Sequence, residues 1–174
     1  MPLPTPVTPQ SSAITQFLKF NLLAGMTALL PVEQLAAALK IEAAKITPIP
    51  HLPTWVMGVY NWRGEVLWIV DIGHLLEISP WQRQAAPPAH YNILLLEQMS
   101  TETSAQKYLG LLVQQIEGIE LLSLDEIQSS TAVSDSLAPF LRGYWLDDAG
   151  DMLALLDGLA IFDRMPTRSI KALH

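Results

Sequence analysis

The sequence predicts an all-β protein made of two similar, strand-rich units. Short apolar segments typical of strands recur along the chain, such as FLKFNL at 17–22, which mixes two-residue alternation with a nearly continuous apolar run, and EVLWIVD at 65–71. Turn-forming residues separate these segments at the close spacing that is typical of small barrels. The chain also repeats itself weakly, so each half is expected to build about five short strands.

Three pairs of segments carry this repeat. VEQL in the first half resembles VQQI in the second, PTWVMGV resembles PFLRGYW, and VLWIVDIGHLL resembles MLALLDGLAIF. The matched positions keep the same order in both halves, with a spacing that drifts as small loop insertions would produce: Val32 and Val113, Gly58 and Gly143, Asp71 and Asp157. We therefore expect two related units of about 75 to 85 residues that share an apolar contact.

Composition narrows the class of protein. Half of the 174 residues are apolar, which favours a packed core over disorder. The net charge of −7 argues against nucleic acid as the main partner, because such proteins usually carry a basic surface. The absence of cysteine excludes disulfides and thiolate metal sites. The start resembles no signal peptide and no apolar run is long enough to span a membrane, so the expected location is the cytoplasm.

The expected chain organisation has a proline-rich extended tail at 1–14, a first unit at 15–81, a second unit at 90–165 and a C-terminal tail at 166–174. Most of each unit is expected to be strand. One segment differs: apolar residues about one helical turn apart predict a short amphipathic helix over 32–46, which the following prolines would end.

No enzyme motif is present. Walker, G-x-G-x-x-G and G-x-S-x-G patterns are missing, and no histidine lies at metal-ligand spacing from another. We therefore expect no catalytic residue, no metal and no cofactor. Asp71 follows an apolar strand as a phosphorylated aspartate would, but Asp71 and Asp157 each precede a short helical pattern, which favours N-capping.

The hairpin VYNWRGEVLW raises the question of why a charged side chain occupies its tip. Gly64 suits the turn because glycine accepts positive φ, whereas the turn does not require Arg63. Trp55 and Trp68 are expected in the core, while Trp62 lies beside the arginine. Tryptophan and arginine dominate interface hot spots, which favours a partner contact, with a solvated turn arginine as the alternative.

The longer stretch PTWVMGVYNWRGEVLWIVDIGHLL, which contains this hairpin, resembles the signature of the CheW-like coupling family, P-x-F-I-x-G-V-x-N-x-R-G-x-x-x-P-V-I-D-L. LGLLVQQIEGIELLSLDEI and FLRGYWLDDAGDMLALLDGLAIF resemble its second half, so the resemblance spans about residues 15–165. The matching positions of the signature are Pro53, Gly58, Val59, Asn61, Arg63, Gly64, Val70 and Asp71.

The resemblance implies two SH3-like five-stranded β-barrels packed together, with short helices. It implies a non-enzymatic scaffold that couples the cytoplasmic tip of a methyl-accepting receptor to the regulatory domain of a CheA-type histidine kinase. That regulatory domain has the same fold, so alternating partners could close into rings. Nucleic acid is not an implied partner, and the membrane is reached only through the receptor.

Site residues follow from the same resemblance. The kinase and receptor coupling interface corresponds to Val32, Gln34, Leu35, Asn61, Trp62 and Arg63. An apolar groove for the receptor tip corresponds to Val113, Ile116 and Ile119.

The chain departs from the family pattern at Gln34, where glutamate is usual, and at Trp68, where proline is common. The tryptophan-rich hairpin resembles the branch that serves pilus-based phototaxis. Two alternatives stay open: a catalytic or ligand-sensing module that uses Asp71, and an SH3-like module that binds proline-rich peptides outside chemotaxis.

Overall fold

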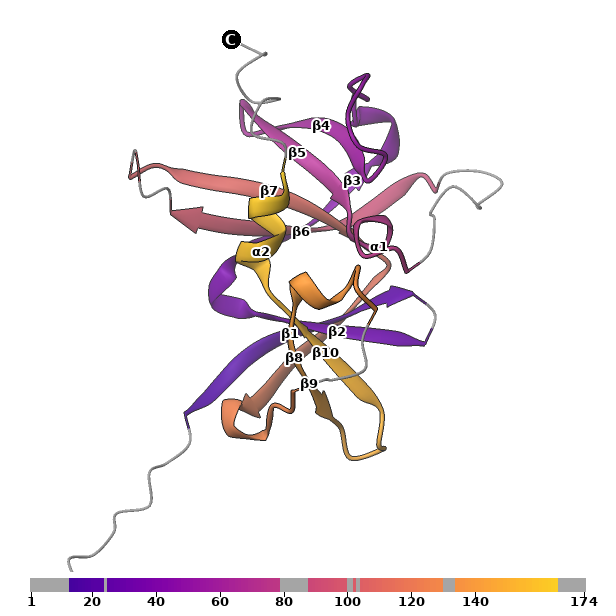
Figure 1. Cartoon of the computed structure of the whole chain (residues 1–174). Helices are drawn as coiled ribbons and strands as arrows, with labels where there is room; N and C mark the ends of the chain where they lie inside the picture. Colours follow the sequence, from indigo (N-terminus) through magenta and orange to yellow (C-terminus); the bar gives the residue numbers. More distant parts are fainter. Residues whose placement is uncertain are drawn as a thin grey trace, which may run out of the picture.

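The computed structural model describes residues 13–23, 25–78, 88–99, 102, 104–129 and 134–165. Two five-stranded sheets form its upper and lower layers, and α1 and α2 lie at their junction (Figure 1). We call them the central and the terminal sheet. The central sheet has the order β3-β6-β7-β5-β4, with β3 (Leu35–Glu42), β4 (Val56–Trp62), β5 (Glu65–Asp71), β6 (His90–Met99) and β7 (Gln106–Val113).

The terminal sheet contains strands from both ends of the chain. Its order is β8-β1-β2-β10-β9, with β1 (Ile14–Leu23), β2 (Met26–Pro31), β8 (Gln115–Ser123), β9 (Leu141–Leu146) and β10 (Met152–Leu156). Single helical turns punctuate the strands: η1 (Val32–Gln34), η2 (Ala43–Lys45), α1 (Ile72–Leu75), η4 (Leu124–Glu126) and η5 (Ala138–Phe140). The longest described helix is α2 (Gly158–Arg164).

The helix predicted over 32–46 is wrong. The segment is strand β3, flanked by the single turns η1 and η2, and β3 pairs antiparallel with β6. Its burial alternates along the strand, with Ala37, Leu39 and Ile41 turned toward a small core under the central sheet. Alanine favours helices, but cross-strand pairing and burial override that weak preference.

The repeat is confirmed in the hydrogen bonds. Asp71 N donates to Trp55 O, and Asp157 N donates to Phe140 O, each at 2.8 Å. Each aspartate then caps the helix that follows its strand, as the sequence predicts: Asp71 accepts from the backbone of α1, and Asp157 from that of α2. Strand β5 pairs parallel with β7 as β10 pairs parallel with β2, so the two sheets have the same internal plan.

Gly58 and Gly143 occupy equivalent positions in β4 and β9, as predicted. Both have positive φ, 143° and 157°. A β-carbon on Gly58 would lie 2.1 Å from Thr47 O, and one on Gly143 would lie 2.7 Å from Gln128 O. In both sheets a backbone segment crosses the strand at this point, so a side chain does not fit.

The strands of the two sheets are not divided as the expected units 15–81 and 90–165 are. The central sheet takes all its strands from Leu35–Val113, whereas the terminal sheet joins the first hairpin, β1–β2, to β8–β10. The second repeat ends after α2, so it has no strands that correspond to β6 and β7 of the first repeat. The hairpin β1–β2 at the start of the chain takes their places in the terminal sheet. The reason is pairing: β10 needs a parallel neighbour, and β2 provides it.

The sheets curl without closing, so the expectation of closed barrels is wrong. In the central sheet the segment after β3 reaches the opposite edge strand only through the bridge between Thr47 and Val59. In the terminal sheet the corresponding bridge joins Gln128 and Tyr144. Each sheet thus bends around its own small core.

The largest apolar cluster lies between the two sheets. It includes Phe20 and Leu30 of the terminal sheet and Trp68 and Leu94 of the central sheet. The predicted core position of Trp68 is confirmed. Trp55 is partly buried and packs against the same cluster, as predicted. Of the predicted tails at 1–14 and 166–174, residues 1–12 and 166–174 lie outside the described residues. Within the described residues, no helix has the length and apolarity that a membrane crossing requires.

Candidate interaction surfaces

The β4–β5 turn holds Arg63 in an unfavourable backbone conformation. Arg63 has φ 53° and Gly64 has φ 83°, so both central residues of the turn have positive φ, as in type I′ turns. The Asn61 side chain supports the turn by accepting a 2.9 Å hydrogen bond from Gly64 N. Type I′ turns favour asparagine or glycine at the position of Arg63. The arginine therefore opposes the local preference of the chain, which is evidence for a role beyond folding.

An aromatic support lies beneath the arginine. The Arg63 guanidinium carbon is 4.9 Å from the ring centroid of Trp62, within cation–π distance. Trp62 in turn makes an edge contact with Tyr108, with centroids 4.9 Å apart. The Tyr108 hydroxyl donates to Gln106 Oε1 at 2.8 Å, and Gln106 Nε2 donates to Glu97. This chain of contacts presents an exposed, oriented guanidinium at the edge of the central sheet.

The predicted coupling residues of the VEQL segment lie elsewhere, where η1 carries the chain from the terminal to the central sheet. Leu35 packs against the cluster between the sheets. The side-chain oxygen Oε1 of Gln34 is buried without a hydrogen-bond partner and lies against Gly158. Val32 is half-buried, whereas Glu33 is exposed. Glu33 therefore presents the one carboxylate of the VEQL segment to solvent, one position before the family's usual glutamate.

The predicted receptor-groove residues separate into core and surface. Val113 is 3% exposed and belongs to the cluster between the sheets, so its side chain lies below the surface of this face. Ile116 is half-buried against the same cluster, and Ile119 is 53% exposed. A register shift between β1 and β8 places Ile116 opposite Phe20 and Ile119 opposite Leu18, so both isoleucines share one face.

The exposed face of β8 extends beyond the predicted positions. Leu121 pairs with Gln16 on this same face and is 62% exposed, and Ile14 at the start of β1 is 70% exposed. We call Ile14, Ile119 and Leu121 the β8 strip. The sequence analysis missed Ile14 and Leu121. The alternation of IELL after Gly118 could have identified Leu121 once Ile119 was placed outward.

The structure favours the capping interpretation of Asp71. The residue is 5% exposed, and its carboxylate accepts from His74 N at 3.2 Å. Burial raises the pKa of Asp71 above the usual 3.8, although the hydrogen bonds and His74 oppose this shift. A phospho-acceptor needs an accessible carboxylate, which Asp71 does not offer. Across the described residues, no three histidine, aspartate or glutamate side chains gather as a metal site would need.

These features describe a double-sheet β-protein whose distinctive surface groups are suited to protein contacts: an oriented arginine on an aromatic support and an exposed apolar strand face. The CheW-like domain family matches residues 16–165, and the chain belongs to this family.

Curated relatives agree with this assignment. Chemotaxis protein CheW of Rhizobium meliloti (strain 1021) is 33% identical over 117 residues, which cover 67% of this chain and 68% of the relative. Protein PilI of Pseudomonas aeruginosa is 28% identical over 106 residues, covering 59% and 53%. Among solved structures, scaffolding protein TtCheW from Thermoanaerobacter tengcongensis has a TM-score of 0.68 at 19% identity, covering 83% of this chain and 90% of that one. That structure supports the fold.

Proposed function

We propose that this protein is a non-enzymatic cytoplasmic scaffold that couples a methyl-accepting receptor to a CheA-type histidine kinase in a taxis pathway. Family membership supports the class of function, as do relatives named for chemotaxis and scaffolding. The observation that carries the proposal for this chain is Arg63, which is exposed, supported by Trp62 and held at positive φ.

The two surfaces suit different partners. Arg63 offers a planar fork of donors for a carboxylate or for backbone carbonyls of the kinase regulatory domain. The β8 strip offers apolar side chains for the apolar stripe of a receptor helix. We assign the first surface to the kinase and the second to the receptor. The tryptophan-rich hairpin leads us to place the chain in the pilus-based phototaxis branch, which loss of directed movement in a deletion strain would test.

The substitution Arg63→Ala tests the role of the arginine. Arginine and alanine both have to adopt positive φ at this position, at a similar cost. The free energy of unfolding should therefore change by no more than about 1 kcal/mol. Assembly of the complex with the cell's receptor and kinase should weaken about tenfold or more, as hot-spot truncations do. The measurements are urea unfolding and co-purification of the ternary complex.

A matched control is Arg142→Ala, which removes an exposed arginine from β9 in the other sheet. It should leave complex assembly within about twofold of wild type, as neutral surface positions do. If Arg63→Ala unfolds the protein, or if both substitutions weaken assembly equally, the proposed role of Arg63 is wrong.

A further inference from the structure

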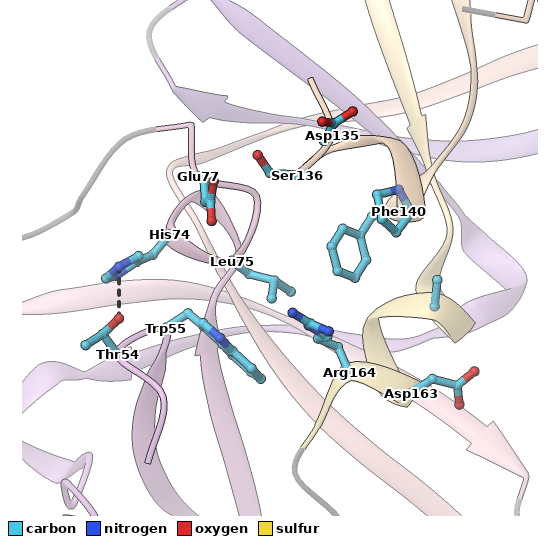
Figure 2. A pocket seen from close by; sticks show the side chains of 12 residues that line it. Thr54, Trp55, His74, Leu75, Glu77, Asp135, Ser136, Phe140, Asp163 and Arg164 are labelled. Atoms are coloured by element: carbon cyan, nitrogen blue, oxygen red, sulfur yellow. Dashed lines mark hydrogen bonds between the residues drawn. The ribbon is translucent and has the colours of Figure 1, made fainter. Parts of the chain in front are cut away.

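A groove of about 470 Å³ opens where the two repeats meet, on the side formed by α1, η5 and α2 (Figure 2). Neither Arg63 nor the β8 strip lines it, so it is separate from both proposed coupling surfaces. Its volume suits one or two side chains of a partner segment. The question is which chemistry would occupy it.

The floor of the groove is built from equivalent positions of the two repeats. Trp55 and Phe140 accept the matching 2.8 Å hydrogen bonds from Asp71 N and Asp157 N, and both line the groove. Leu75 of α1 adds a third apolar side chain beside them (Figure 2). The floor therefore offers an apolar contact surface where equivalent positions of the two repeats meet.

The rim of the groove carries charged side chains, most of them acidic. Glu77, Asp135 and Asp163 bring three carboxylates to the groove, against the single guanidinium of Arg164. In the described part of the chain, none of these four side chains forms an ion pair or a hydrogen bond. His74 is held by the hydroxyl of Thr54 at 3.1 Å. An excess of unpaired carboxylates around an apolar floor is complementary to a cationic partner.

We propose that this groove docks a basic segment of a partner protein, in which an apolar side chain is flanked by lysine or arginine. The apolar side chain packs on Trp55, Leu75 and Phe140, and the flanking cations pair with Glu77 and Asp135. The indole face of Trp55 offers a cation a further favourable position. The net charge of −7 over the whole chain steers such a segment toward the protein.

Arg164 has a defined role in this arrangement. Its guanidinium projects between Trp55 and Phe140 in Figure 2, so it repels an incoming cation. The proposal therefore predicts opposite effects for neutral substitutions on the two charge types. Removing carboxylates should weaken binding of a basic segment, and removing Arg164 should strengthen it. A merely hydrophobic groove would show neither effect.

The test titrates the full-length protein with two blocked pentapeptides, acetyl-Lys-Leu-Lys-Phe-Lys-amide and the same peptide with glutamate for each lysine. Amide chemical shifts of the isotope-labelled protein report both affinity and location. The basic peptide should bind more tightly than the acidic one and shift Trp55 and Phe140. Glu77→Gln combined with Asp135→Asn should weaken binding about fivefold, and Arg164→Gln should strengthen it about twofold, as exposed ion pairs allow.

The matched control combines Asp148→Asn with Asp125→Asn, which removes two exposed carboxylates from the terminal sheet. It should leave the affinity within the change expected from net charge alone. The proposal is overturned if neither peptide binds, if the acidic peptide binds equally well, or if the control weakens binding as much as the groove variant. The unchanged amide pattern of each variant shows that it is folded.

Discussion

The two repeats share a backbone plan but present different surfaces. On the edge strand β3 of the central sheet, a register shift after Leu35 places Leu35, Ala38 and Lys40 on the same face. Ala38 and Lys40 are exposed there. On the equivalent strand β8, the outward residues are Ile119 and Leu121. A small residue and a charge on one strand correspond to two large apolar residues on the other, so an apolar helix has more to bury on the terminal sheet.

The hairpin tips differ in the same way. The β4–β5 tip carries Arg63 on an aromatic support. The β9–β10 tip carries three aspartates, and Asp147 uses its carboxylate to accept from the backbone N–H groups of Ala149 and Asp151. One tip is therefore cationic and the other anionic. The comparison teaches that the repeated positions maintain the fold, while the positions that diverge between repeats are those available for partners.

The largest expected effect tests the shared part of this comparison. Gly58→Ala would place a β-carbon 2.1 Å from Thr47 O, and Gly143→Ala would place one 2.7 Å from Gln128 O. Backbone at both sites must move, so each substitution should lower the free energy of unfolding by about 3 kcal/mol or more. Urea unfolding measures this.

Gly118→Ala is the control for these two substitutions. Gly118 also has positive φ, 148°, but nothing lies within 4 Å of a β-carbon placed there. Only backbone strain is added, so the loss should be about 1 to 2 kcal/mol. A loss at Gly118 as large as at Gly58 would show that strain, and not the close backbone approach, explains the equivalent glycines.

An intermediate effect tests the divergent strand faces. Ile119→Asp should reduce binding of a receptor cytoplasmic tip about tenfold, because it places a charge in the proposed apolar contact. The equivalent substitution Ala38→Asp on β3 should change that affinity by less than about threefold. Both side chains are exposed, so both variants should keep wild-type unfolding curves. Equal losses would place the receptor across both strands and remove the asymmetry.

The smallest effect concerns pH. Burial raises the pKa of Asp71 in the folded protein above its unfolded value near 3.8. Between these two values the folded chain holds a proton that the unfolded chain has released, so this group's contribution to stability falls as pH rises through that window. Asp71→Asn keeps an oxygen acceptor for His74 N and has no such titration.

The stability of Asp71→Asn relative to wild type should therefore increase as pH rises from 3.8 through the folded pKa. Urea unfolding of both proteins at several pH values measures the difference. A relative stability that falls over this range would mean that the hydrogen bonds to the carboxylate outweigh its desolvation. In that case the pKa would be lowered and the capping of α1 would depend on the charge.

Local patterns in the sequence were sufficient for the hairpins, the caps and the repeat. Gly64 marks the β4–β5 turn, Asp71 and Asp157 precede their helices, and Gly58 matches Gly143, because turns, caps and close approaches restrict residue type within a few positions. The prominence of Arg63 was also visible, since the residue exceeds what its turn requires. Its positive φ and its contact with Trp62 were not.

Only the tertiary structure decided how the repeats are assembled. The pairing of β2 with β10 takes the first hairpin away from its own half of the chain, and no local pattern encodes a partner so far along the sequence. Another long-range pairing makes 35–42 a strand, because β6 pairs antiparallel with it. Packing between the sheets buries Val113 and leaves Ile119 outside, although both are apolar residues of strands that follow one another in the chain. Residue type set what each position can contact, and the packing of the two sheets set what it does contact.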